Sequence, residues 1–223
     1  MIRATMSDAY DLLHRGTLAL AQVEWNGLRV NTEYCAKETE KLSKEIARLQ
    51  DEFNKSTLGM RWKERYGEKY NTSSSPQLSY MLYKDLKLDP AKTTRKGNWS
   101  TDEEALESLD LPELRLLIKE RKLAKIQGTY LDSFVRETTD DFLHPFYNLH
   151  TAVTYRSSSQ SPNFQNIPVR DPEAMRICRG AVFARKGHQL LEADFSSLEV
   201  MIAACYHKEI GRASCRERVY VLV

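Results

Sequence analysis

The sequence predicts an α+β fold in which long helices come first and a small antiparallel sheet follows. Up to about residue 136, apolar residues recur at helical spacing, whereas after Thr138 short apolar runs alternate with polar loops. Helices and strands that are segregated along the chain are typical of α+β domains. With 223 residues, 41% of them hydrophobic, the chain can form one large domain or two small ones with a real core.

The first predicted helix runs from Ser7 to about Trp25 and is amphipathic. Asn26 and Gly27 then predict a turn, because glycine tolerates positive φ, and residues 28–30 form a short extended piece. A second helix, which Asn31 or Thr32 can cap and which runs to about Lys55, has the strongest periodicity in the chain and predicts packing against a partner helix along one stripe. That stripe consists of Cys35, Leu42, Ile46, Leu49 and Phe53.

The region between 71 and 111 predicts short helices separated by loops. Residues 71–76 are typical of a loop that leads into a helix, and residues 89–99 form a basic, turn-rich loop. Ser100 with Glu103, and Thr101 with Glu104, have the spacing of a capping box, so a helix should begin there.

The segment from Pro112 to about Val135 predicts a long helix that is strongly basic. Its cations are Arg115, Lys119, Arg121, Lys122 and Lys125. One interpretation is a solvated helical face. The other is a rail for a phosphate backbone, where each neutralised phosphate releases counterions.

The last third predicts the sheet. Residues 150–154 favour a strand, residues 156–170 an ordered polar loop, and residues 189–194 a buried strand. A helix from Ser196 to about His207 should follow.

Bulk properties exclude several classes of protein. No apolar run approaches the ~20 residues that span a bilayer, so we expect no membrane partner. Residues 1–5 also lack the apolar stretch of a signal peptide. We therefore expect a cytoplasmic location, in a bacterial cell or a virus-infected host. The four cysteines form no CxxC pair, which favours reduced buried thiols over a zinc site. A net charge of +2 does not by itself indicate a nucleic-acid binder.

Residues 210–223 differ from the rest of the chain. Residues 210–219 have no apolar period, and they match the translation of a common short-read sequencing adapter. We therefore expect the native sequence to end near Glu209, with an ordinary basic tail as the alternative. Without Arg212, Arg216, Arg218 and Glu217 the formal charge falls from +2 to 0.

Two segments carry a family resemblance. Residues 156–170 fit an Arg-x-Ser-Ser segment followed by Pro-Asn-x-Gln-Asn-Ile-Pro-x-Arg, and residues 194–199 fit Asp-Tyr-Ser-x-Ile-Glu. Both resemble DNA polymerases of family A, and looser similarity extends from about Tyr10 to Glu209. Tyr155, Phe195 and Met201 depart from the family pattern, which indicates a divergent branch such as a viral one.

The resemblance implies that the polar loop tests duplex geometry. Every Watson–Crick pair presents acceptors in the minor groove. Donors that could reach these acceptors are Arg156, Asn163, Gln165 and Asn166, on a loop stiffened by Pro162 and Pro168. The alternative is a surface loop whose Asn and Ser side chains satisfy their own turns.

The resemblance assigns metal binding to Asp194, at the end of an apolar run. Two-metal phosphoryl transfer needs carboxylates that hold two Mg²⁺ ions. By resemblance, Asp194 bridges both ions and is catalytic, and the backbone carbonyl of Phe195 ligates one. Ser196, Glu199 and Arg170 are implied to bind the incoming nucleotide. Glu199 also fits a capping box with Ser196, and a simple loop role for Asp194 is the alternative on spacing alone.

The resemblance further implies a truncated polymerase domain. Residues 1–31 would be a palm-base helix and connector, 32–136 a helical thumb in which Arg121 and Lys125 track the duplex backbone, and 137–209 a partial palm. Primer-template DNA and deoxynucleoside triphosphates are the implied partners. The fragment should not polymerise alone, because a triphosphate-binding helix and a second carboxylate are missing. The alternatives are a non-catalytic duplex-binding module and a single-subunit RNA polymerase.

Overall fold

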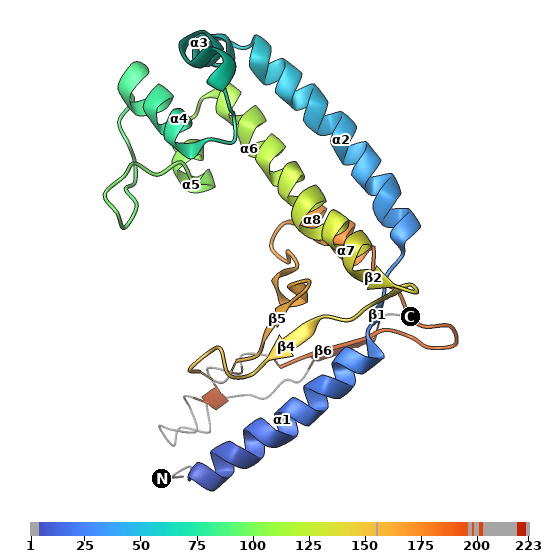
Figure 1. Cartoon of the computed structure of the whole chain (residues 1–223). Helices are drawn as coiled ribbons and strands as arrows, with labels where there is room; N and C mark the ends of the chain where they lie inside the picture. The colour runs from blue at the N-terminus through green and yellow to red at the C-terminus, as the bar shows by residue number, and fades with distance from the viewer. Residues whose placement is uncertain (1–4, 155, 196–197, 199–200, 203–217, 222–223) are drawn as a thin grey trace. The chain divides into compact units, whose positions relative to one another are not determined.

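The structure, a computed structural model, describes residues 5–154, 156–195, 198, 201–202 and 218–221 (Figure 1). The chain divides into two compact units. The helical unit contains Thr32–Arg136 and Ile167–Arg179, and the mixed unit contains Met1–Asn31, Glu137–Asn166 and Gly180–Val223. Residues 167–179, which the sequence analysis placed in the partial palm of 137–209, therefore belong to the helical unit.

The helical unit is built around two long helices that lie side by side, α2 and α6 (Figure 1). Its elements are α2 (Thr32–Lys55), α3 (Thr57–Tyr66), η1 (Gly67–Lys69), α4 (Ser75–Tyr80), η2 (Met81–Asp85), α5 (Glu103–Glu107), α6 (Pro112–Lys125), η3 (Ile126–Leu131), α7 (Asp132–Glu137) and α8 (Pro172–Arg179). On the predicted stripe of α2, Leu42, Leu49 and Phe53 are buried, whereas Ile46 is partly exposed.

Polar contacts fix the pairing of the two long helices. Gln50 donates from Nε2 to Glu120 Oε1 over 2.8 Å, and Lys119 Nζ lies 3.0 Å from Glu45 Oε1. Helix α6 continues without a break through η3 and α7, as the sequence predicts for one long helix over 112–135. The partner helix predicted for α2 is thus the basic helix.

The core of the helical unit surrounds Trp62, which is fully buried. Phe53 and Tyr70 meet its indole edge-on, with ring centroids 6.1 and 5.7 Å away. Its Nε1 donates to Gln77 Oε1 over 3.0 Å, so the one polar atom of the indole has a partner. A buried aromatic that is also hydrogen-bonded fixes the relative positions of α2, α3 and α4.

Helix α8 was not predicted from the sequence. Asp171 caps it, because its Oδ1 accepts from Ala174 N over 2.8 Å, and Pro172 occupies the first turn. Its Cys178 is buried, as is Cys35 on α2, and burial raises the pKa of these thiols to about 12 and about 11. The prediction of free buried thiols is confirmed for this pair, and Cys205 and Cys215 lie outside the described residues.

The mixed unit combines one long helix with small antiparallel sheets. Its elements are α1 (Met6–Asn26), β1 (Leu28–Arg29), β2 (Thr138–Thr139), β3 (Phe142–Leu143), β4 (Phe146–Asn148), β5 (Ser158–Gln160), η4 (Phe164–Asn166), β6 (Leu191–Asp194) and β7 (Arg218–Val221). The strands form a sheet of order β1-β3-β2 and the pairs β4-β5 and β6-β7, all antiparallel. Gly27 ends α1 at φ +63°, which confirms the predicted turn.

Helix α1 is tied to the strand region by polar contacts at its C-terminal end. Tyr147 N donates to Glu24 Oε1 over 2.6 Å, and the backbone carbonyl of Glu24 lies 2.7 Å from His144 Nδ1. Arg185 donates to the backbone carbonyl of Asn26 and lies over the Phe142 ring, 4.9 Å from its centroid.

Three local predictions are wrong. Residues 150–154 contain bends and turns rather than a strand, because the strands that pair are β4 and β5 on either side of them. Strand β6 is exposed along its length rather than buried. Asp102, not Ser100 or Thr101, caps α5, since its carboxylate accepts from Ala105 N over 2.9 Å.

The α+β class is confirmed, because helices dominate the first part of the chain and short antiparallel strands the second. Among the described residues, no helix has both the length and the apolar character required to cross a bilayer.

Candidate functional site

Asp194 lies at the end of strand β6 and is exposed. Successive side chains of a strand point to opposite faces, so Glu192 lies on the same face two residues earlier. Phe195 follows immediately and is also exposed. Ser196 and Glu199, the residues predicted to contact a nucleotide, lie outside the described residues. The carboxylate of Asp194 is therefore accessible at a strand end, where the sequence analysis placed it.

Asp194 fits a metal site as one contributor. In the part of the chain that the structure describes, no three His, Cys, Asp or Glu side chains gather where they could hold a metal ion. Mg²⁺ prefers oxygen ligands and is commonly held by one or two carboxylates together with substrate phosphates and water. The carboxylate of Asp194 and the adjacent carbonyl of Phe195 are donors of that kind, and further ligands would have to complete the site.

The polar loop is ordered by its own side chains. Ser159 is buried; its Oγ donates to Asn163 Oδ1 over 3.1 Å and accepts from Gln165 N over 3.1 Å. Gln165 also donates from Nε2 to Ser157 Oγ over 2.8 Å. Pro162 is buried behind a cis Ser161–Pro162 bond. The loop is thus a defined structure rather than a mobile connector.

These hydrogen bonds determine which polar atoms of the loop stay available to a ligand. Asn163 and Gln165 each use one polar atom within the loop, as expected for a surface loop that satisfies its own turns. Asn163, Gln165, Asn166 and Arg156 are nevertheless all exposed. An Asn or Gln side chain carries two amide hydrogens, so a single contact leaves Gln165 a further donor. Order within the loop and donation outward are compatible.

Arg170, the last residue of the same motif, belongs to the helical unit, where it is exposed. Its neighbour Asp171 caps α8 and forms an ion pair with Lys122 of α6. The hydrogen bond that the Ala174 backbone N–H donates lowers the pKa of the Asp171 carboxyl most, and the contact with Lys122 lowers it further. The ion pair therefore connects the residue that follows Arg170 to the basic helix α6.

The basic helix is largely neutralised by its surroundings. Arg115 pairs with Asp110, Lys119 with Glu45 and Lys122 with Asp171. This pattern favours the interpretation of a solvated, ion-paired helical face for these three cations.

Arg121 and Lys125 differ from those cations. Arg121 is partly buried, donates from Nη2 to the Thr72 carbonyl over 2.8 Å, and has its pKa lowered by burial. Lys125 is exposed, and no ion pair recorded for the described residues involves it. Both line a groove of about 330 Å³ together with Lys122 and Pro168. The structure thus brings the two residues predicted to track a phosphate backbone to one surface.

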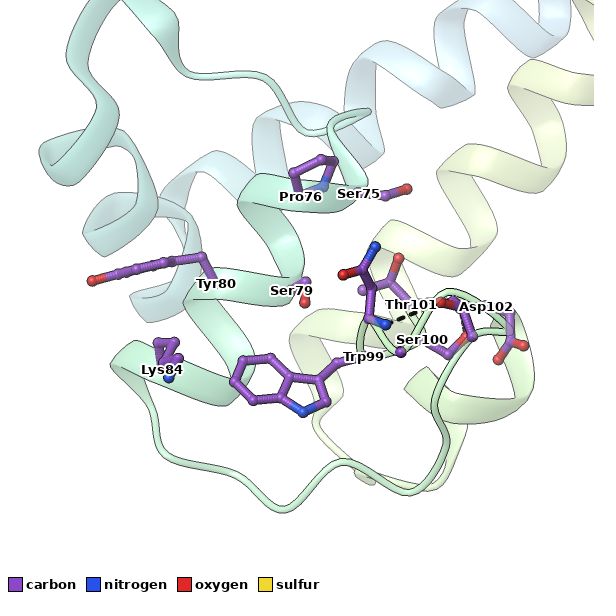
Figure 2. A pocket seen from close by; sticks show the side chains of 12 residues that line it. Ser75, Pro76, Ser79, Tyr80, Lys84, Trp99, Ser100, Thr101 and Asp102 are labelled. Carbon is purple, nitrogen blue, oxygen red and sulfur yellow. Dashed lines mark hydrogen bonds between the residues drawn. The ribbon is translucent and has the colours of Figure 1, made fainter.

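A larger pocket of about 790 Å³ lies elsewhere in the helical unit, and the sequence analysis did not identify it. Figure 2 shows Ser75, Pro76 and Ser79 of α4 on one side and the loop carrying Trp99 to Asp102 on the other. Lys84 lies over the Trp99 ring, 5.1 Å from its centroid, and Tyr83 meets the same ring edge-on at 5.5 Å. These contacts fix the indole in the pocket wall.

The pocket is lined mainly by polar side chains. Its lining includes six hydroxyl side chains, a primary amide, one lysine and one carboxylate; these are Ser75, Ser79, Tyr80, Thr94, Ser100, Thr101, Asn98, Lys84 and Asp102. Hydroxyl, amide and backbone N–H donors together with Lys are the groups that contact nucleic-acid phosphates. The signal in the sequence was a Ser, Thr and Asn cluster around Trp99 in the basic loop.

Comparison with known proteins gives consistent matches. Residues 32–210 match the family model for DNA polymerase family A. DNA polymerase I of Rhizobium leguminosarum is 33% identical, over 90% of this chain and 19% of that protein. The thermostable DNA polymerase I of Thermus filiformis is 36% identical, over 83% of this chain and 22% of that protein.

A solved structure is similar as well. It is the POL domain of Pol1 from M. smegmatis in complex with a DNA primer-template and dNTP, with a TM-score of 0.71 and 29% identity. The match covers 83% of this chain and 32% of that one. The chain spans about a fifth of the length of the two curated relatives. Because the family model covers most of the sequence, including Asp194 and the polar loop, this chain belongs to DNA polymerase family A.

Proposed function

We propose that this chain is part of a template-directed DNA polymerase that adds deoxynucleotides to a primer 3′ end. The observation that carries the proposal is a single family match over 32–210, which contains both Asp194 and the loop of 156–170. The similar M. smegmatis structure holds a DNA primer-template and dNTP, and we propose the same partners here.

Asp194 is the proposed catalytic and metal-binding residue. Its exposure at the end of β6 supports this role, because a carboxylate that binds a metal and a substrate must be accessible. Asp194 and the carbonyl of Phe195 would hold Mg²⁺. When bound, Mg²⁺ lowers the pKa of a coordinated hydroxyl and neutralises phosphate charge. By the family resemblance, Ser196, Glu199 and Arg170 would bind the incoming nucleotide.

The helical unit is proposed to hold the duplex backbone, as a thumb does. The pocket around Trp99 supports this role through its hydroxyl donors and Lys84. The groove lined by Arg121 and Lys125 supplies the cations that the sequence predicted. We further propose that the mixed unit is the partial palm, and that Arg156, Asn163, Gln165 and Asn166 face the minor groove.

DNA binding can be tested with the chain as it is. Binding of a fluorescent primer-template duplex is measured at several salt concentrations by anisotropy. We expect Lys84→Ala and Lys125→Ala each to weaken binding for all sequences alike and to reduce the salt slope by about 1, as for lysines that contact phosphate. Lys37→Ala, at an exposed ion-paired position on α2, is the control and should change neither quantity. Equal effects of all three substitutions would refute the proposed backbone contacts.

Catalysis and simple DNA binding make different predictions. A non-catalytic duplex-binding module would bind DNA through the same surfaces, but would gain no primer extension when the remainder of a polymerase domain is added. The proposed polymerase gains template-dependent extension, whereas the chain alone should show none. Deoxynucleotide incorporation on a labelled primer distinguishes the two.

A further inference from the structure

The motif of residues 156–170 is divided between the two units. Residues 156–166 belong to the mixed unit, where hydrogen bonds within the loop fix Asn163 and Gln165. Residues 167–170 belong to the helical unit, together with α8. The loop's own hydrogen bonds do not reach Arg170, so the position of this residue depends on contacts within the helical unit.

Arg170 is exposed and forms no contact of its own through its side chain. Among the described residues, no hydrogen bond, ion pair or ring contact involves its guanidinium. The preceding Val169 is 60% exposed, so it does not anchor the segment by packing. The planar fork of N–H donors suits a phosphate group, but it stands at the end of a flexible side chain. The backbone that carries Arg170 therefore sets where its guanidinium can reach.

That backbone is held by the next residue, Asp171, which uses both oxygens of its carboxylate. Oδ1 accepts from the backbone N–H of Ala174 over 2.8 Å, and Oδ2 pairs with Lys122 Nζ of α6. The backbone carbonyl of Asp171 accepts from Met175 N over 2.8 Å. The side chains of Asp171 and Lys122 are 28% and 35% exposed, so salt screens this pair less than one at the open surface. Asp171 thus joins the start of α8 to α6.

Helix α8 is itself fixed within the helical unit. Its Ala174, Ile177 and Cys178 are buried. Tyr34 of α2 donates its hydroxyl to the Ile177 carbonyl over 3.3 Å, and α8 also packs against η3, the continuation of α6. The segment that carries Arg170 is therefore attached to both long helices.

The partners of Lys122 show that its charge is engaged within the protein. The hydrogen bond to Asp171 raises the pKa of Lys122 most. The charges of Glu173 and Glu103 raise it further. Lys122 is therefore charged at neutral pH and has acids around it, which compete with any phosphate for its ammonium group. This surrounding suits a structural contact better than a contact with DNA.

We propose that Asp171 and Lys122 are positioning residues for Arg170, whose guanidinium they hold where it meets a phosphate group of the substrate. Neither residue touches the substrate, because Lys122 fixes Asp171 and Asp171 fixes the backbone next to Arg170. The inference rests on the proposed function, in which Arg170 binds the incoming nucleotide, and it adds a role for two residues outside the motif. A displacement of about 1 Å can cost about 10²-fold in rate, so the attachment matters for function.

The test measures, in the full chain, how the effect of Arg170→Ala depends on the ion pair. One arm measures binding of a fluorescent primer-template duplex by anisotropy. The other measures binding of a radiolabelled deoxynucleoside triphosphate with Mg²⁺ by equilibrium dialysis. In the unsubstituted background Arg170→Ala should weaken binding about tenfold, the scale of one hydrogen bond to a charged group. The arm that responds shows whether the phosphate belongs to the duplex or to the triphosphate.

Loss of the ion pair should remove most of that effect. Asp171→Asn keeps a capping oxygen on α8 but loses the charge that binds Lys122, and Lys122→Ala leaves the cap intact. In either background we expect Arg170→Ala to cost less than about threefold, because residues that act together are not additive. Lys122→Arg keeps the pair and should restore the full effect. A general loss of stability would not produce this rescue.

Lys119→Ala is the matched control, because Lys119 lies one turn earlier on α6 and forms an ion pair with Glu45 over 3.0 Å. Arg170→Ala should keep its full effect in this background. The proposal is overturned if Arg170→Ala costs the same in every background, or if it costs nothing in either arm. A chain that binds neither ligand contradicts the proposed function as well, whereas a chain that binds with additive effects contradicts the positioning role alone.

Discussion

The two units of this chain differ in how much of their structure they can maintain alone. The helical unit encloses Trp62 and its neighbours in a closed core, with hydrogen bonds and ion pairs between its long helices. The described residues of the mixed unit form mainly one long helix and short strands, in which Trp25 and Leu191 are largely exposed and Phe146 is half exposed. The described residues of the helical unit have the internal packing of a domain, whereas those of the mixed unit bury few apolar side chains.

The proposed roles follow the same division. A surface that holds any duplex needs a rigid scaffold and accessible donors, and the helical unit has both around Trp99. A catalytic centre needs ligands from several segments, and the mixed unit offers Asp194 on an open strand.

The largest effect is expected at Asp194. In a polymerase assembled from this chain and the remainder of the domain, Asp194→Ala should reduce primer extension at least ~10³-fold, the scale of losing a principal electrostatic stabiliser. Glu192→Gln, two residues earlier on the same strand face, is the control and should cost less than tenfold, because a single lost contact is worth about 1 kcal/mol. A modest loss at Asp194 would remove its assigned role.

A pair of tryptophans compares the two cores directly. Trp62→Ala in the helical unit should lower the free energy of unfolding by about 3–5 kcal/mol, since it empties a packed site. Trp25→Ala in the mixed unit should change it by no more than about 0.5 kcal/mol, because the indole is exposed. Urea unfolding followed by far-ultraviolet circular dichroism measures both. Similar losses would show that the mixed unit has a core after all.

A pair of glycines tests packing on a finer scale. A Cβ on Gly59 would lie 2.0 Å from the Phe53 carbonyl oxygen, which is backbone and cannot move aside easily. Gly59→Ala should therefore cost about 1–3 kcal/mol of unfolding free energy. A Cβ on Gly16 would meet only the end of the flexible Leu149 side chain, and alanine favours the helix by up to about 1 kcal/mol, so Gly16→Ala should be neutral or stabilising. Thermal unfolding of the two variants provides the comparison.

The smallest effect concerns Asp171. Removing the α8 cap in Asp171→Ala should lower the unfolding free energy by about 1 kcal/mol at pH 7, whereas Asp171→Asn keeps a capping oxygen and loses only the ion pair with Lys122. The folded pKa of Asp171 lies below its ordinary 3.8, so its contribution is complete above that value and disappears as the pH falls through the lowered pKa. Urea titrations at pH 7 and in acid should show the difference in stability between the unsubstituted protein and Asp171→Asn narrowing in acid.

Local signals predicted much of the fold. The repeat through Cys35, Leu42 and Leu49 marked the buried side of α2, because a helix repeats its faces every three to four residues whatever surrounds it. Asn26–Gly27 marked the end of α1 through glycine's tolerance of positive φ. The strand predicted at 150–154 was misplaced, because β-propensity depends on context and the two strands that pair, β4 and β5, lie on either side of these residues. Helix α8 was missed although Asp171–Pro172 has the form of a helix start.

The sequence alone therefore determined the family, the order of the elements and the identity of the candidate residues, since motifs and helical periods are local properties of the chain. Only the tertiary structure decided which of these residues are already engaged. In the folded chain, Asn163 and Gln165 form hydrogen bonds within their own loop. Lys119 and Lys122 form ion pairs with acids from other segments. The apolar side chains on one side of α1 stay exposed. Such outcomes depend on which surfaces meet in space, and a one-dimensional pattern does not contain that information.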